Sequence, residues 1–195
     1  DTKCYLLAQD EIGTIPKYIK TNHVDLKAGG GEIEFARTLF KLGFFKKHPV
    51  KIGEAMVVPY DFLLKIWPDV PSPANMIKLV ESGKLHNAHF WVSVEERGIH
   101  EKKSVTRKAM VRFPDQIAIN KAYPGTNYVS YAAGLCAAIF ALSISKIKQT
   151  GVFPPEAIES AVRKEIIEAL RKYDIKIDIT EKNDRENSAT PEIKS

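Results

Sequence analysis

The chain has 195 residues, and its 44% hydrophobic content is enough to build a core, so most of it is not expected to be disordered. Its net charge is only +5, and the basic residues are interspersed with acidic ones rather than forming a stripe with aromatic residues, so nucleic acid is not an expected partner. Two cysteines, Cys4 and Cys136, are too few for a disulfide framework, and we interpret both as buried residues of a cytoplasmic protein.

Short strands and amphipathic helices alternate in the first part of the chain. Gly43 follows a helical pattern as a C-terminal cap, and Pro59 suits the first turn of a helix. The expected elements are a strand at 4–8, a helical turn up to 16, a strand at 23–27, a helix at 32–42, two strands within 50–58, and helices at 60–67 and 76–80.

The second part contains the clearest strand pair, which we expect to be joined by a turn containing Gly98. The expected elements are strands at 89–95 and 104–113, an irregular stretch at 115–123, helices at 130–147 and 156–173, and a strand at 175–179. This order predicts an α+β fold with a mixed β-sheet and flanking helices. No signal peptide is recognised, and the apolar stretch 131–144 is shorter than a membrane span, so we expect a buried helix and no membrane contact.

Several motifs resemble the C-terminal part of the saccharopine dehydrogenase family. The run GTNYVSYAAGLCAA at 125–138 is similar to the family's Gly-Thr entry into a small-residue helix, and GVFPPE at 151–156 resembles the turn before its last long helix. The run YDIKI at 173–177 is similar to the closing strand, although the family often has glycine in place of Asp174. Earlier segments, such as VVPYDFL at 57–63, agree in order, so the resemblance covers residues 1 to 180.

The resemblance implies the substrate-side part of an NAD(P)-dependent oxidoreductase of lysine or amino-acid metabolism, a homodimer that acts on the CH–NH bond of saccharopine or a related amino acid. It implies a fold like the C-terminal domain of glyceraldehyde-3-phosphate dehydrogenase, with residues 1–124 for substrate binding and dimerisation, 125–180 packing toward a nucleotide-binding domain, and 181–195 as a polar tail. NAD or NADP is expected to bind mainly outside this chain, because no Gly-x-Gly-x-x-Gly occurs between a strand and a helix.

The family's substrates carry several carboxylates, which arginine binds as a two-pronged donor. Arg97 and Arg107, on or near the expected hairpin, are therefore candidate substrate ligands, unless they are ordinary solvated charges. Backbone N–H groups at Gly30 and Gly31, ahead of a helix, are a further candidate for carboxylate binding, with a flexible turn as the plainer interpretation.

Polar residues also stand at the start of the long apolar helix. Thr126, Asn127 and Ser130 either cap that helix or contact a ligand carboxylate at its N-terminus. The catalytic residue is not identified, although the histidines His86, His89 and His100 are candidate acids or bases. No metal-binding pattern occurs among them.

Two other classes of function stay open. The domain could serve as a non-catalytic dimerisation or amino-acid-sensing module, in which the alternating strand at 89–95 extends a sheet across a two-fold axis. It could also be a general anion-binding domain, for which the basic charge balance is the support.

Overall fold

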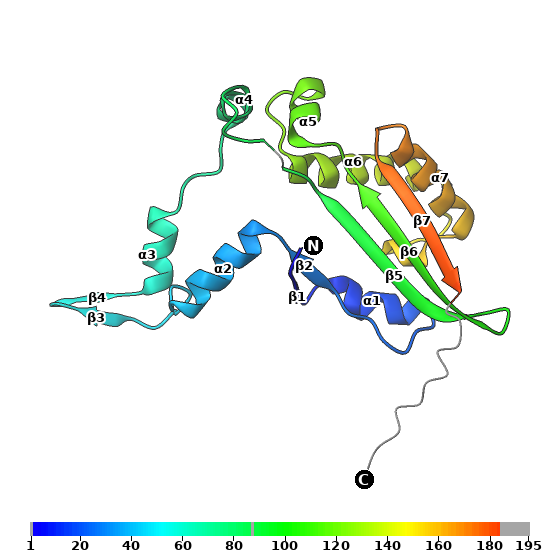
Figure 1. Cartoon of the computed structure of the whole chain (residues 1–195), viewed down its shortest axis with the longest axis horizontal. Coiled ribbons are helices and arrows are strands. Elements are labelled where there is room, and N and C mark those ends of the chain that lie inside the picture. The colour runs from blue at the N-terminus through cyan, green and yellow to red at the C-terminus, as the bar shows by residue number, and fades with distance from the viewer. Residues whose placement is uncertain (1, 87, 184–195) are drawn as a thin grey trace, which may run out of the picture. The chain divides into compact units, whose positions relative to one another are not determined.

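The computed structural model describes residues 2–86 and 88–183 (Figure 1). The chain forms two compact units: residues 1–70 with 151–158, and residues 71–150 with the chain from Glu159 onward. The boundary expected at residue 124 falls inside the second unit. Of the expected polar tail, residues 181–183 belong to a strand, and residues 184–195 lie outside the described part.

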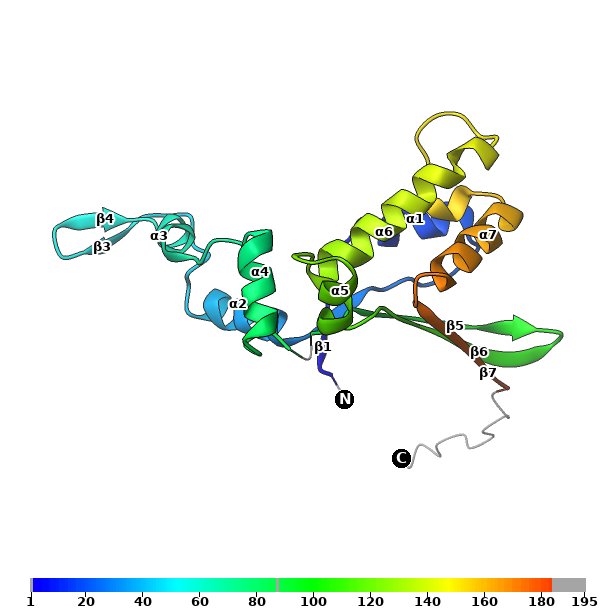
Figure 2. The same cartoon turned by 90° about the horizontal axis from the view of Figure 1, so that it is seen from above.

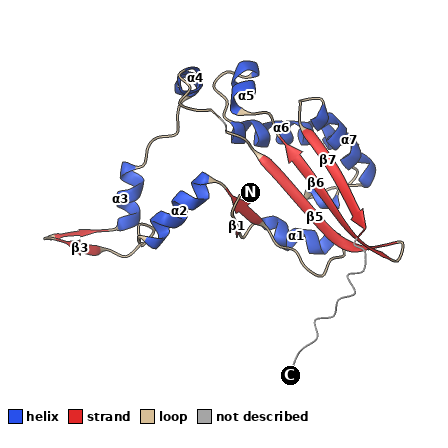
Figure 3. Cartoon of the chain, viewed as in Figure 1, coloured by secondary structure: helices blue, strands red, loops and turns tan. Residues whose placement is uncertain are grey.

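The first unit combines two antiparallel strand pairs with short helices (Figure 3). Its elements are β1 (Cys4–Leu6), α1 (Asp10–Tyr18), β2 (Lys27–Gly29), α2 (Gly31–Lys41), β3 (Val50–Ile52), β4 (Ala55–Val57), α3 (Pro59–Ile66) and the 3₁₀ turn η2 (Pro155–Ala157). The strand expected at 23–27 is wrong by several residues, because pairing with β1 places Leu6 opposite Lys27 and Cys4 opposite Gly29.

Helix α2 shows how local signals set an element of this unit. Glu32 and Glu34 lie in its first turn and Lys41 in its last, which the helix dipole favours. Gly43 follows the helix with φ of +85°, and the next N–H, that of Phe44, donates to the carbonyl oxygen of Leu39 at 3.0 Å. The predicted helix and its glycine cap are both confirmed.

The second unit is built around a three-stranded sheet in the order β5-β6-β7. Its elements are α4 (Pro73–Glu81), β5 (Trp91–His100), β6 (Lys103–Arg112), α5 (Gln116–Ala122), α6 (Tyr128–Ser143), η1 (Ile144–Lys146), α7 (Ser160–Arg171) and β7 (Lys176–Asn183). The α+β class is confirmed, but every strand pairing in the described residues is antiparallel, so the expected mixed sheet is wrong. The tight turn between β5 and β6 permits only antiparallel pairing.

The turn of the β5–β6 hairpin consists of Glu101 and Lys102, whose φ angles are +48° and +64°. Positive φ at both central residues is the geometry of a type I′ turn, whose twist matches that of the strands. Gly98, which the sequence places in the turn, instead lies within β5 opposite Val105. The glycine signal is misleading here because two non-glycine residues adopt the left-handed conformation.

The core of the second unit lies on one face of this sheet. Phe113, Ala132 and Ile175 form its buried centre, and Val111 of β6 and Ile177 of β7 pack against them. Side chains of α6 and α7 contribute to the same cluster, so these helices cover that face (Figure 2). On this face lie the even-numbered residues of β5 and the odd-numbered residues of β6 and β7, as the register requires.

Two helices of this unit differ from expectation. The stretch 115–123, expected to be irregular, forms α5, whose first turn is capped by the Asp115 Oδ1 atom accepting from the N–H of Ala118 at 2.8 Å. Helix α6 is expected to be buried, but only three of its residues are: Ala132, Ile139 and Ser143. The sheet covers one side of α6 and leaves the other exposed.

The apolar character of α6 continues into η1. Together they span Tyr128–Lys146, a segment long and apolar enough to cross a membrane by length and composition, with 11% of its most apolar window buried. The expectation of a stretch shorter than a membrane span is therefore wrong for the helix as a whole. A core helix of a soluble protein meets the same criterion, so this finding assigns no location.

Candidate functional site

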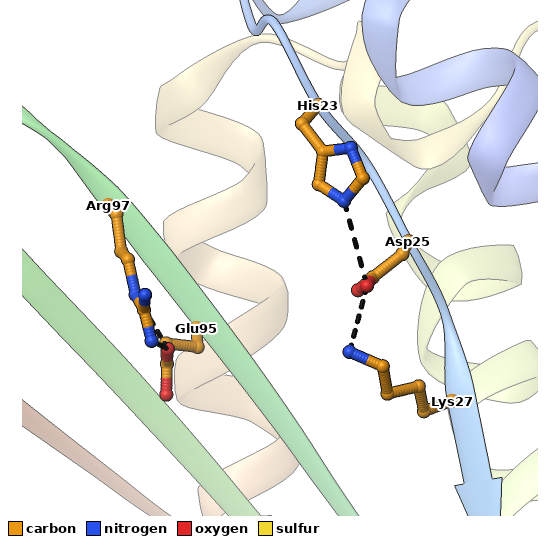
Figure 4. Close-up of polar contacts among 5 residues, drawn as sticks. All are labelled: His23, Asp25, Lys27, Glu95 and Arg97. Carbon is orange, nitrogen blue, oxygen red and sulfur yellow. Dashed lines mark hydrogen bonds and ion pairs between the residues drawn. The ribbon is translucent and has the colours of Figure 1, made fainter. Parts of the chain in front are cut away.

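Arg97 lies on β5 and is engaged by a neighbour on the same strand. Its Nε and Nη2 atoms donate to Oε1 of Glu95 at 3.0 and 2.7 Å (Figure 4). Both side chains are open to solvent, with 77% of Arg97 and 43% of Glu95 exposed. An ion pair this exposed contributes little to stability, and the guanidinium keeps donors available for a second acidic group.

Arg107 lies on β6 and reaches across to β7. Its Nε and Nη2 atoms donate to Oε2 of Glu181 at 3.0 and 2.6 Å. Hydrogen bonding and charge attraction from Glu181 raise the pKa of Arg107, and the charge of Glu96 raises it further. Arg107 is thus held between two carboxylates, one on each neighbouring strand.

The sheet register separates the two candidate arginines. Arg97 stands opposite Thr106, and Arg107 stands opposite Glu96. Because Glu96 and Arg97 are consecutive on β5, their side chains point to opposite faces, and so do those of Arg97 and Arg107. Arg107 shares the face on which the core lies, whereas Arg97 lies on the other face. The two candidate arginines therefore lie on opposite faces of the sheet and are not placed to bind one small ligand together.

The glycine turn belongs to the first unit and connects the end of β2 to the start of α2. Gly30 precedes α2 with φ of +132°, and Gly31 is the first residue of that helix. A side chain on Gly29 would collide with the carbonyl oxygen of Lys3, 2.5 Å from the position of its Cβ. Glycines 29 and 30 are thus required for close strand approach and for an unusual φ, which supports the plainer interpretation of this turn.

Of the three polar residues predicted at the start of α6, Asn127 caps the helix. Asn127 is the N-cap, and its Oδ1 atom accepts from the N–H of Ser130 at 2.7 Å. The carbonyl oxygen of Thr126 accepts a hydrogen bond from the Gln116 side chain, at 2.8 Å from Nε2. Of the two interpretations left open by the sequence, capping is the one that the structure shows for Asn127.

Gln116 is a buried polar residue that the sequence analysis missed. It has no exposed surface, and besides donating to Thr126 its Oε1 atom accepts from the N–H of Tyr128 at 2.9 Å. One amide group thus fastens α5 to the turn that begins α6. No local pattern signals this role, because its two partners lie ten and twelve residues further along the chain.

The turn between α5 and α6 is also tightly built. Gly125 has φ of +83°, and a Cβ atom there would lie 2.7 Å from Cβ of Pro73, at the start of α4. The Asn120 Oδ1 atom accepts from the N–H of Gly125 at 3.0 Å. The glycine of the Gly-Thr motif is therefore required by its positive φ and by its close contact with Pro73 in the same unit.

The candidate histidines do not form a cluster. The Nδ1 atom of His86 lies 2.8 Å from the carbonyl oxygen of Gly83, and the His89 ring lies 5.6 Å from that of Trp91. His100 ends β5 beside the hairpin turn. Within residues 2–86 and 88–183, no group of three or more His, Cys, Asp or Glu side chains is placed to hold a metal ion.

The cysteines differ from each other. Cys4, expected to be buried, is exposed because β1 has only β2 as a neighbour in its sheet, whereas Cys136 on α6 is partly covered. Burial raises the pKa of the Cys136 thiol. Neither cysteine pairs in the described part of the chain.

A linear polar cluster occurs in the first unit (Figure 4). Asp25 forms an ion pair with Lys27, at 2.8 Å between Nζ and Oδ2, and its Oδ2 atom lies 3.6 Å from Nε2 of His23. The hydrogen bond from Lys27 is the main cause of a lowered Asp25 pKa. The His23 side chain is 80% exposed, so this cluster lacks the enclosure typical of a catalytic site.

An open depression of about 250 Å³ lies between α6 and α7. Ile139 and Ala169 form part of its wall, and Lys146, which pairs with Glu165, borders it. None of the residues predicted for substrate binding lines it.

No protein-family model matches the chain, and no curated protein matches it, so the expected relation to saccharopine dehydrogenases depends on the motifs alone.

Proposed function

We propose that this chain is the substrate-side domain of an NAD(P)-dependent oxidoreductase resembling the saccharopine dehydrogenases, acting on the CH–NH bond of saccharopine or a related amino acid. One observation carries the proposal: the motifs of the resemblance coincide with successive structural elements. The run at 125–138 forms the capped turn and α6, the run at 151–156 contains the turn before α7, and the run at 173–177 leads into β7.

Within this proposal Arg107 is the best-supported substrate ligand. It lies on the face of the sheet that α6 and α7 cover further along, and its guanidinium already donates two hydrogen bonds to the carboxylate of Glu181. A substrate carboxylate would replace Glu181 or use the remaining donors. Arg97 lies on the opposite face and is not assigned to the same ligand.

The cofactor would supply the hydride acceptor or donor, and we assign no residue of this chain to it. In the described residues the glycine turn follows β2, a three-residue strand with an antiparallel partner, rather than a parallel strand of a nucleotide-binding unit. The contribution of this chain is therefore to bind and orient the amino acid, with the carboxylate on Arg107.

Thermal-shift measurements with saccharopine, glutamate and lysine test the proposal. We expect a rise in melting temperature that is largest for saccharopine and smallest for lysine, because the ligand with more carboxylates gains more charge-assisted hydrogen bonds. Arg107→Gln should lose the ligand-dependent rise, measured against its own baseline.

Arg97→Gln is the matched control, since it removes the same group from the opposite face. It should keep the ligand-dependent rise. A chain that responds to none of the three ligands, or that loses its response in Arg97→Gln and not in Arg107→Gln, contradicts the proposal and favours a non-catalytic dimerisation or sensing domain.

A further inference from the structure

Strand β5 is a long, open edge of the sheet in the second unit. All ten of its residues are exposed, and in the described structure β6 is its only strand neighbour. The two-residue turn makes His100 and Lys103 the closing hydrogen-bonded pair of the hairpin. Successive residues of a strand direct their backbone N–H and C=O groups alternately toward the partner strand and away from it. Counting back from His100, the even-numbered residues of β5 therefore bond to β6, and the odd-numbered residues direct these groups toward the open edge. These residues are Trp91, Ser93, Glu95, Arg97 and Ile99.

The described residues make no backbone hydrogen bond at this outer edge. Unpaired N–H and C=O groups along a long strand are a template for another strand. An antiparallel partner related by a two-fold axis perpendicular to the sheet places a residue opposite one of the same parity, because opposite residues share a face.

The side chains of β5 are self-complementary in one such register. With Glu96 opposite its own copy, Glu95 of each chain stands opposite Arg97 of the other. In this register the odd-numbered residues of one β5 strand stand opposite odd-numbered residues of the other. Their outward N–H and C=O groups can therefore form hydrogen bonds between the two strands. Arg97 and Glu95 already attract each other along the strand, and both are exposed.

Neighbouring registers are less favourable. A shift in one direction puts Glu95 opposite Glu95, and a shift in the other puts Arg97 opposite Arg97, and like charges directly opposite are destabilising. Either shift also loses both crossing Glu95–Arg97 pairs, whereas the favoured register keeps both and has one like-charge pair, Glu96 opposite Glu96. In the favoured register the two Glu96 side chains meet on the other face, where Arg107 stands opposite each Glu96 within its own chain. The central acidic pair is thus flanked by two arginines.

We propose that β5 is the docking edge for a second copy of this chain, with two β5 strands paired antiparallel about a two-fold axis at Glu96. The two three-stranded sheets then join into one continuous sheet, with Glu95–Arg97 ion pairs crossing the junction twice. This pairing gives an interface to the homodimer that the family resemblance implies. It does not depend on ligand binding, so sedimentation tests the interface and thermal-shift measurements test the proposed function independently.

Sedimentation velocity over a concentration series tests this interface by charge exchange. Glu95→Arg alone makes both residues of every crossing pair arginine, and Arg97→Glu alone makes both of them glutamate. Each single variant should therefore dimerise at least about tenfold more weakly than the original chain. A mixture of the two single variants should form a one-to-one heterodimer, because an arginine pair in one chain then faces a glutamate pair in the other. The mixture restores the attraction between chains without restoring the pair along one strand.

The double variant, with both charges exchanged, should recover the homodimer. A chain that is monomeric throughout the series overturns the proposal. So does a dimer that neither single variant weakens, or a mixture that gains nothing over its components. Circular dichroism of each variant separates lost pairing from lost folding.

A backbone variant tests the same edge independently of charge. Ser93→Pro removes an outward N–H that β6 does not use, so it should weaken the dimer while leaving the hairpin intact. Ser93→Ala is the control and should dimerise like the original chain. Hydrogen exchange of β6 reports whether the hairpin survives, and an intact Ser93→Pro hairpin with undiminished dimerisation overturns the proposed pairing.

Discussion

The two units of this chain differ in how their apolar residues are used. The second unit places one face of a three-stranded sheet against α6 and α7, around Phe113, Ala132 and Ile175. The first unit has only two-stranded pairs, and among its described residues the buried apolar ones are Leu39, Leu63 and Ile158, while Phe40 stays 68% exposed. A sheet with helices on one face makes a core, whereas isolated strand pairs do not.

The largest expected effect is on the core of the second unit. Ile175→Ala should lower the free energy of unfolding by about 2–5 kcal/mol, because Ile175 is 2% exposed within the central cluster. Ile179→Ala, on β7 and 60% exposed, should cost less than about 1 kcal/mol. Urea unfolding of both variants measures the difference, and equal losses would break the comparison between core and surface.

The buried amide of Gln116 comes next. Gln116→Leu should cost about 1–3 kcal/mol, because the N–H of Tyr128 and the carbonyl of Thr126 both lose their partner without gaining water. Gln9→Leu is the control in the first unit, at an exposed position with no side-chain capping bond, and should change stability by less than about 0.5 kcal/mol. If the two variants behave alike in urea unfolding, Gln116 does not fasten α5 to α6.

The cap of α6 has a smaller expected effect. Asn127→Ala should cost about 1 kcal/mol, whereas Asn127→Asp keeps an acceptor for the N–H of Ser130 and should retain most of the stability. In the first unit, by contrast, the N-cap of α2 is Gly30, which offers no side-chain cap. A ligand-binding role would give a different pattern: a lost thermal response to saccharopine with the free energy of unfolding unchanged.

The smallest expected effect is a difference in reaction rate between the thiols of the two units, which involves no change in stability. Cys4, exposed in the first unit, should react with iodoacetamide faster than Cys136. Burial both covers the Cys136 thiol and raises its pKa, so at about pH 8 a smaller fraction of it is the reactive thiolate. Mass spectrometry of peptides over time gives both rates, and faster labelling of Cys136 would mean that α6 opens more readily than β1.

Much of the secondary structure could be predicted because its signals are local. The helical spacing before Gly43 and the Pro59 start led to α2 and α3, and alternation led to β5 and β6. The errors occur where pairing with another strand fixes the bounds of a strand or turn. Strand β2 begins at Lys27 because β1 pairs there, and Gly98 lies in a strand because the turn closes at His100 and Lys103.

The candidate site was less predictable than the fold. Asn127 was recognised as a cap or ligand residue because capping is a relation between residues three apart. Gln116 was missed, since an amide in the sequence carries no sign that it is buried or that it bonds a turn ten residues on. The stretch 115–123 was expected to be irregular, so Gln116 could not be assigned to the buried or the exposed face of a helix.

By itself, the sequence determined the α+β class, most helices and the hairpin strands, because these follow from the spacing of apolar residues and from glycine, proline and capping residues. Only the tertiary structure decided which face each side chain takes. Arg97 and Arg107 look equivalent in sequence, but the pairing of β5 with β6 turns them to opposite faces. The physical reason is the two-residue period of a strand: a register shift of one residue would exchange the faces, and the register is set by the turn and by the core packed on the sheet.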